Sequence, residues 1–423
     1  MQVKAVKLVK KTRIVGLMAC MLFGWSTLAM AQTAGDVFTI DRLAVDATGA
    51  SAADARDIAM TQGRNEALQL LFHRLTPQSY WGILPQITGS DVVSMVAGLS
   101  LANEKTSATR YLADATYKFK PARIREALRS ADIPFSETQA RTAIVLTILE
   151  TPEGSFLWQA ENPWAMIWQD RLLGNELVPL LLPLGELEDL VSVRVEDALA
   201  HNWEVLNPLA ERYGVSEVML AHVKIADMEG TAGMQLQMVR LNGGKMPVER
   251  LGLIIENQDA LPLEALLELG IGEVLERLNE SWKRQTIIRS DAVSDLVAAT
   301  IHFSDYQEWL EIQKRLKRVP TIREFDILAL STQGAEVMLQ FVGSFAQLRV
   351  SMAQRDLDLL DNNVTALISL RSGAEALPDL PVEEMTEVIG TNDSVAGAAD
   401  DMNMLDLYGT RPSNSDDATT NDW

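Results

Sequence analysis

AADARDIAMTQGRNEALQLLFHRL, residues 52–75, is the stretch that decides the fold of the N-terminal part of this chain. Small or apolar residues recur in it every four positions: Ala55, Ala59, Gly63, Ala67, Leu71 and Leu75. This period predicts a helix with one ridge, and the low side-chain bulk at its start lets the helix lie close against a sheet. Ser51, with Asp54 three residues on, predicts the N-terminal cap, and Thr76-Pro77 predicts the end.

The segments that flank this helix supply strands for the sheet. A strand is predicted at Val37–Val45. A second strand is predicted at Tyr111–Lys120, because apolar and polar residues alternate over its whole length. A short helix is expected at Asp91–Leu101, and Pro121 is suited to the first position of a helix that ends near Ala131. Residues 32–137 are therefore predicted to form a small N-terminal α+β module.

A central α/β module is predicted for residues 138–284. Thr142–Leu149 is a continuous apolar run of the kind that forms a strand buried on both faces. Asn242-Gly243 favours a hairpin between the strands Met234–Leu241 and Val248–Glu256, because both turn positions need positive φ. The amphipathic pattern of Pro262–Lys283 predicts a long helix that closes the module.

The third predicted module, residues 285–372, follows the order βαββαβ. Its expected strands are Val297–Phe303, Thr321–Leu330, Glu336–Val342 and Val364–Leu370, and its expected helices are Ser304–Leu316 and Ser344–Ala353. This order predicts a ferredoxin-like sandwich, in which both helices cover one face of a four-stranded antiparallel sheet. The fold class is thus α+β, with three small modules.

An acidic segment, residues 373–423, follows the third module. From Ala374 onwards it contains twelve Asp or Glu residues and one Arg, with few apolar residues between them. Such a composition cannot bury enough apolar surface to offset the entropy of ordering, so we expect a disordered tail.

The first 31 residues read as a secretory signal peptide. A basic leader without acidic residues precedes the apolar run Ile14–Met30, and Ala29-Met30-Ala31 predicts cleavage after Ala31. The alternatives are an uncleaved membrane anchor and a lipoprotein attached through Cys20. The expected location is the periplasm of a Gram-negative bacterium, and no membrane-spanning segment is expected in the mature chain.

Charge and cysteine content exclude several classes of function. The formal net charge is −21, which argues against nucleic acid as a partner. Cys20 is the only cysteine, so a mature chain without it has no disulfide and no cysteine nucleophile.

No catalytic, metal or cofactor site is predicted. Neither a zinc-binding HExxH, nor a serine-hydrolase elbow, nor a phosphate-binding loop occurs, and the histidines stand apart in sequence: His73, His201, His222 and His302. The acidic run Glu186–Asp189 is interpreted as a solvated loop.

Aromatic residues cluster between Phe156 and Trp168, and the candidate interaction residues are Trp158, Trp164 and Trp168. Trp164 and Trp168 are four positions apart and would share one face of a helix. Two interpretations stand: a stacking platform for a sugar or a peptidoglycan fragment, and packing of the helix against the sheet.

Several stretches resemble a known family. They are the helix that ends LLFHRLT, the run YLADATYKFKPARIREALRSADIPF, the segment LVPLLLPLGELEDL and the run NPLAERYGVSEVMLAHV. Over Val37–Val223 the chain resembles the proteobacterial exported proteins of domain-of-unknown-function family number 2066. The resemblance implies an exported protein and no particular activity.

These observations lead to a working hypothesis. The chain is expected to be a non-enzymatic periplasmic scaffold or adaptor whose partner is another envelope protein. The alternative is a sugar-binding or peptidoglycan-binding module that uses the region Trp158–Trp168.

Overall fold

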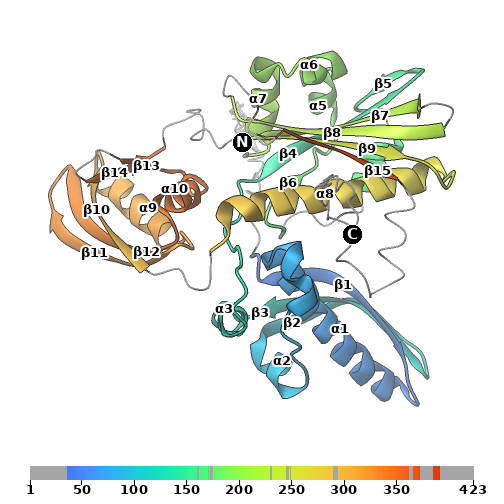
Figure 1. Cartoon of the computed structure of the whole chain (residues 1–423), viewed down its shortest axis with the longest axis horizontal. Helices are drawn as coiled ribbons and strands as arrows, with labels where there is room; N and C mark the ends of the chain where they lie inside the picture. Colours follow the sequence, from blue (N-terminus) through green and yellow to red (C-terminus); the bar gives the residue numbers. More distant parts are fainter. Residues whose placement is uncertain are drawn as a thin grey trace, which may run out of the picture. The chain divides into compact units, whose positions relative to one another are not determined.

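The computed structural model describes residues 36–159, 162–169, 171, 175–228, 231–243, 247, 249–288, 294–361, 365–371 and 384–390. These residues form eleven helices and three sheets, a mixed α/β architecture (Figure 1). The signal peptide expected at residues 1–31, including Cys20, lies outside the described residues. Most of the acidic segment 373–423 lies outside them as well.

The first module is built on a three-stranded antiparallel sheet with the order β1-β3-β2. Its elements are β1 (Thr39–Thr48), α1 (Ala52–Leu75), the 3-10 helix η1 (Gln78–Ile83), α2 (Ser90–Met95), β2 (Val96–Thr106), β3 (Arg110–Phe119) and α3 (Pro121–Ser130). Figure 1 shows α1 lying along one face of this sheet.

The ridge predicted for α1 is confirmed, because all six of its residues are buried. The Ser51 side chain accepts a hydrogen bond from the Asp54 N–H at 3.2 Å, which caps the first turn. A Cβ atom at Gly63 would lie only 2.4 Å from Cγ1 of Val45 on β1. The small residues therefore set how closely the helix approaches the sheet.

The prediction of a helix at Asp91–Leu101 was wrong in its second half. Helix α2 ends at Met95, and the chain continues directly into β2, which pairs with β3. Most side chains of β2 are exposed, since it is an edge strand that contributes little to the core. An edge strand of this kind carries no apolar alternation by which the sequence could reveal it.

A seven-stranded sheet forms the centre of the second module. Its order is β15-β9-β8-β7-β4-β5, and β6 pairs with β4. The elements are β4 (Ala143–Thr151), β5 (Gly154–Phe156), α4 (Pro163–Gln169), β6 (Leu180–Leu181), α5 (Leu187–Ser192), α6 (Val195–Leu199), α7 (Trp203–Arg212), β7 (Val218–Met228), β8 (Thr231–Leu241), β9 (Glu249–Glu256), α8 (Leu263–Thr286) and β15 (Glu384–Gly390).

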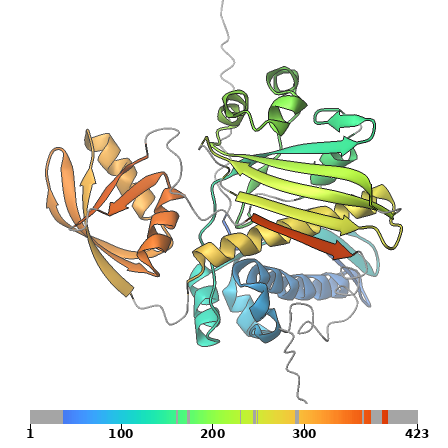
Figure 2. The same cartoon turned by 45° about the horizontal axis from the view of Figure 1, so that its top comes forward.

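Helices cover both faces of this sheet, as Figures 1 and 2 show. Along β7, Met219 and Ala221 belong to the core that contains α8, whereas Val218 and Leu220 belong to the core that contains α7. The first seven residues of β4 are buried, as expected for a strand covered on both faces. The predicted pairing of β8 with β9 is confirmed, but the two-residue turn is not: Arg240 pairs with Glu249, and of Asn242 and Gly243 only Gly243 has a positive φ.

Strand β15 was not expected, because it lies in the segment predicted to be disordered. Its seven residues pair in parallel with β9 at the edge of the sheet (Figure 2). The expectation of disorder does not hold for these residues. Met385, Val388 and Ile389 supply the local apolar content that the acidic average of the segment conceals.

The third module has five strands and not the four that the ferredoxin-like pattern predicts. Its elements are β10 (Ser294–His302), α9 (Tyr306–Leu316), β11 (Ile322–Leu330), β12 (Gly334–Val342), α10 (Phe345–Ala353), β13 (Leu357–Asp361) and β14 (Ala366–Leu370). The order is β11-β12-β10-β14-β13, and β14 runs parallel to β10. The additional strand β13 turns back into β14, so the direction of the last strand is reversed relative to a four-stranded antiparallel sheet.

One hydrophobic core includes residues of both the first and the second module. Phe72 and Leu75 of α1 belong to the same buried cluster as Ile271 and Val274 of α8. The third module has its own core between the sheet and the helices α9 and α10. The cavity described next lies where α1 and α8 meet.

Candidate functional site

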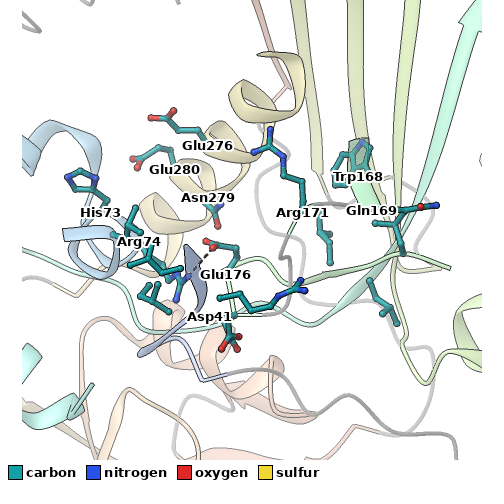
Figure 3. A pocket seen from close by; sticks show the side chains of 18 of the residues that line it. Asp41, His73, Arg74, Trp168, Gln169, Arg171, Glu176, Glu276, Asn279 and Glu280 are labelled. Atoms are coloured by element: carbon teal, nitrogen blue, oxygen red, sulfur yellow. Dashed lines mark hydrogen bonds and ion pairs between the residues drawn. The ribbon is translucent and has the colours of Figure 1, made fainter. Parts of the chain in front are cut away.

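A cavity of about 1070 Å³ is lined by residues of β1, the C-terminal half of α1, the neighbourhood of α4 and β6, and α8. Its apolar wall includes Ile40, Leu43, Leu70, Leu180, Leu181 and Leu182. Its polar wall includes Arg42, His73, Arg74, Arg171, Glu176, Glu276, Asn279, Glu280 and Lys283. Figure 3 shows the polar side chains arriving from α1, α8 and the chain near α4.

Lys283 is a buried cation at this site, with 3% of its side chain exposed. Its Nζ donates hydrogen bonds to the carbonyl oxygens of His73 (2.9 Å) and Thr76 (2.8 Å) and to Oε1 of Glu280 (2.5 Å). Burial lowers the pKa of Lys283, and Glu280 opposes that shift. Three acceptors need all three protons of an ammonium group, so the side chain is charged and saturated.

His73 adds an aromatic contact beside Lys283. Its ring stacks on Trp81 with centroids 4.1 Å apart, and Nζ of Lys283 lies 5.6 Å from the centroid of the Trp81 ring. Burial, followed by the charge of Lys283, lowers the pKa of His73. The imidazole is therefore neutral at pH 7.

Arg74 connects α1 to β1 and to the chain before β6. Its Nη1 donates to the carbonyl oxygens of Val37 (3.1 Å) and Thr39 (2.7 Å), and its Nη2 pairs with Glu176 at 3.0 Å (Figure 3). These bonds hold the guanidinium in one orientation. Its Nε is buried without an acceptor in the described part of the chain.

Other polar groups on the wall are uncommitted. Within the described residues, Nε1 of Trp168, Oε1 of Glu276 and Oδ1 of Asn279 are buried atoms that make no hydrogen bond. Burial raises the pKa of Glu276. The exposed guanidinium groups of Arg42 and Arg171 likewise form no ion pair with the residues that the structure describes.

The candidate tryptophans do not form one exposed surface. Trp164 and Trp168 are fully buried and pack edge-to-face, with centroids 5.6 Å apart. The Trp164 indole donates to the Ala221 carbonyl oxygen at 2.9 Å. Trp158 packs with the core on the other face of the sheet, and its indole donates to the carbonyl oxygen of Val193 at 2.7 Å. The two buried rings have no free face for stacking on a sugar, although Trp168 lines the cavity.

Helix α5 has an unusual orientation, with an acid inside and apolar residues outside. Leu184, Leu187 and Val191 are 76%, 76% and 74% exposed, and Leu190 is 41% exposed. Asp189 is buried, with 1% of its side chain exposed. The interpretation of Glu186–Asp189 as a solvated acidic loop was therefore wrong for Asp189, whose carboxylate has partners inside the protein, and for the loop, because Leu187–Ser192 is helical; Glu186 and Glu188 are exposed, as predicted.

Four donors hold the Asp189 carboxylate. Its Oδ2 accepts hydrogen bonds from the backbone N–H groups of Gly185 (3.1 Å) and Glu186 (3.2 Å) and from the hydroxyl of Tyr213 (2.6 Å). Its Oδ1 accepts from Nη1 of Arg212 at 2.8 Å. Burial and the hydrogen bond to Asp189 raise the pKa of Tyr213 to about 12. This network fixes the helix with its leucines directed outwards.

A polar cluster on the central sheet joins residues that are distant in sequence. Nε2 of His222 on β7 lies 3.0 Å from Oε2 of Glu150 on β4, and Nζ of Lys224 lies 2.7 Å from Oε1 of the same carboxylate. The parallel register of β4 and β7 places Glu150 opposite Lys224. The sequence could not reveal this cluster, because its members come from two strands whose pairing was unknown.

Comparison with protein-family models, with curated proteins and with solved structures finds no match to this chain. The resemblance to the exported family therefore stays a prediction. Among the described residues, no helix is long and apolar enough to cross a membrane. No group of three or more His, Cys, Asp or Glu residues in that part of the chain is arranged to hold a metal ion.

Proposed function

We propose that this protein is a non-enzymatic adaptor of the bacterial envelope that binds another envelope protein through the outer face of α5. The observation that carries the proposal is the reversed orientation of this helix. A surface helix normally buries its apolar stripe and exposes its charges. Here Leu187, Leu190 and Val191, at positions i, i+3 and i+4 of α5, are exposed together with Leu184 just before the helix, while Asp189 is buried.

The apolar face of α5 (Leu184, Leu187, Leu190 and Val191) has the properties of an interface. Four exposed side chains of this size present a few hundred Å² of contiguous apolar surface, roughly the largest patch found on an ordinary monomer. The Asp189 network holds the backbone before binding, so little conformational entropy is lost when a partner docks.

The surroundings of this face indicate the chemistry of the partner. Glu186 and Glu188 are exposed beside the leucines, and Glu188 retains 77% of its side-chain exposure. A complementary partner has an apolar groove with Lys or Arg at its rim. The protein's own net charge of −21 favours the same kind of partner.

The absence of enzymatic activity is proposed from the state of Lys283. A buried lysine with a lowered pKa beside a cavity is a common nucleophile or base. In this protein two backbone carbonyls and one carboxylate engage all three of its protons. Deprotonation would leave those acceptors unsatisfied, which supports a role in packing.

Photocrosslinking in intact cells tests the proposal. A photoreactive phenylalanine analogue at Leu187 is expected to capture a discrete protein partner, whereas the same group at Tyr306, 67% exposed on α9, is not. With the photoreactive group at Val191, Leu187→Glu should abolish the adduct at unchanged protein abundance. Equal adducts at Leu187 and Tyr306, or capture at Val191 that survives Leu187→Glu, would contradict the proposal.

Export is tested separately by the mass of the protein recovered from the periplasm. Cleavage after Ala31 predicts a mature chain that begins at Gln32. A lipid-modified chain that begins at Cys20, or a chain of full length in the membrane fraction, would contradict it.

The fold of the third module is part of the proposal as well. We interpret it as a variant of the ferredoxin-like sandwich in which the hairpin β13–β14 replaces the last strand. The strand order β11-β12-β10 and the packing of α9 and α10 into one core with the sheet support this interpretation.

A further inference from the structure

We propose that the cavity between α1 and α8 binds an anionic amphiphile, with its carboxylate or phosphate head at Arg42 and Arg171 and its apolar chain along the leucine wall. This site shares Leu184 with the apolar surface at α5, but its argument does not depend on the proposed function. The inference rests on the cavity, on its charges and on the backbone of β1.

The apolar wall defines the body of the ligand. Ile40, Leu43 and Leu70 line the cavity from the first module, and Leu180, Leu181 and Leu182 line it from the second. The volume of about 1070 Å³ is at the upper end of the range for small-molecule sites. A wall of this composition gains most from a ligand with an aliphatic or aromatic body.

The free charges define the head group. Lys283 is saturated by carboxylate and carbonyl partners, the Nη1 and Nη2 groups of Arg74 are engaged in the same way, and Glu280 and Glu176 are their carboxylate partners. Of the other charged groups on the wall, the Asp41 carboxylate accepts a hydrogen bond from the Asn175 amide, and the Arg42 and Arg171 guanidinium groups have no carboxylate partner in the described chain. Guanidinium is the side chain best suited to carboxylate and phosphate, through charge-assisted hydrogen bonds.

The backbone of β1 directs Arg42 to this cavity at a conformational cost. The pairing of β1 with β3 shifts register between Ile40 and Leu43, and Arg42 in that bulge has φ +44°. A positive φ is unfavourable for a residue other than glycine, and bulges commonly re-aim a side chain at a functional site. The N–H of Arg42 donates to Oγ1 of Thr116 at 3.1 Å, which stabilises the distortion.

The wall residues also contain buried polar atoms without partners, both donors and acceptors, and these atoms do not set the sign of the ligand's charge. Nε of Arg74 and Nε1 of Trp168 are buried N–H donors without acceptors in the described chain, and such orphaned donors are rare in proteins. Oε1 of Glu276 and Oδ1 of Asn279 are unsatisfied acceptors, but incompletely used oxygens are commoner and less costly. Burial also raises the pKa of Glu276, which weakens its attraction for a cation.

Titration calorimetry of the full-length mature protein tests this inference with four probes below their micellar concentrations: dodecanoate, dodecyl phosphate, inorganic phosphate and dodecyltrimethylammonium. We expect dodecanoate or dodecyl phosphate to bind, and the tighter of the two identifies the head group. Inorganic phosphate should bind at least about tenfold more weakly, because it lacks the apolar body. Equal or tighter binding of the ammonium probe would overturn the inference, and so would phosphate binding as tight as that of dodecyl phosphate.

Three variants assign the binding to this cavity. Arg42→Gln and Arg171→Gln are each expected to weaken the anionic amphiphiles by about three- to tenfold, since each removes one charge-assisted contact. Arg349→Gln, at an exposed arginine of α10 outside the cavity, is the matched control and should leave affinity unchanged.

Leu70→Ser tests the apolar wall independently of charge. Leu70 is 41% exposed, so its replacement is compatible with folding. It should weaken dodecanoate and leave inorganic phosphate unaffected. If all three cavity variants keep the melting temperature and the dodecanoate affinity of the parent protein, the site is not this cavity.

Discussion

Gly63 provides the sharpest test of how α1 is packed. The change Gly63→Ala adds one methyl group to the ridge of the helix where it faces β1. The new Cβ would lie 2.4 Å from Cγ1 of Val45 and 3.0 Å from the hydroxyl oxygen of Tyr117. Carbon atoms in contact prefer about 3.5–4.0 Å, so the helix or the strand must move.

Two opposing effects set the expected magnitude. Alanine is favoured over glycine inside a helix by about 0.8–1.0 kcal/mol. Overpacking a tight core site costs about 1–3 kcal/mol, and Val45 is β-branched and 4% exposed, so it has little freedom to yield. We expect a net loss of about 1–2 kcal/mol in the free energy of unfolding.

The matched control is Gly272→Ala in the other 24-residue helix, α8. A Cβ at Gly272 meets no atom within 4 Å, so only the helix-propensity term acts. We expect this variant to be more stable than the parent by about 0.5–1 kcal/mol. The two glycine-to-alanine changes should therefore have opposite signs.

Urea unfolding followed by circular dichroism measures both variants against the parent protein. Gly63→Ala should cost less stability when it is introduced into the Val45→Ala variant than when it is introduced into the parent protein. The reason is that Val45→Ala removes the methyl group that the new Cβ would clash with. Stabilisation by Gly63→Ala equal to that by Gly272→Ala would refute the close packing of α1 on β1.

Three further predictions concern titratable groups. Asp189→Ala should destabilise the protein by about 2–3 kcal/mol, because it leaves buried donors unsatisfied, and it should lower the pKa of Tyr213 from about 12, as ultraviolet titration would show. Glu276→Gln should stabilise the protein at pH 8 but not at pH 4 in thermal unfolding, because the raised pKa of Glu276 means that stability is lost as pH rises through it. Burial lowers the pKa values of His73, His201 and His222. The stability that these neutral side chains contribute is therefore present above pH 6.5 and is lost as the pH falls below that value. His222→Gln should make the stability of the protein less dependent on pH between 7 and 5, as thermal unfolding would show.

The sequence predicted those helices and strands in which the spacing of apolar residues matches the buried face. The ridge of α1, the alternation of β3 and the apolar run of β4 each report directly which side chains face the core. Strands β2 and β13 were missed for the opposite reason. β2 is almost entirely exposed, and β13 has only five residues, two of them exposed.

The candidate site could not be predicted in the same way. Its walls come from four segments separated by tens to hundreds of residues, and they meet only after α1 and α8 have packed. The stripe Leu187, Leu190 and Val191 of α5 is visible in the sequence, but an apolar stripe normally predicts the buried face. Its exposure depends on Arg212 and Tyr213, which draw Asp189 inwards from a later helix.

The end of α1 explains why a cavity exists at the junction with α8. The last carbonyl groups of a helix have no partners within it, and burying them against a second helix requires a donor. Lys283 supplies that donor to His73 and Thr76, and its charge in turn requires Glu280. The junction between α1 and α8 therefore combines an apolar core with a polar cluster around Lys283. The residues that stabilise the junction also line the cavity to which Arg42 contributes, so the packing of α1 on α8 and the proposed ligand site have residues in common.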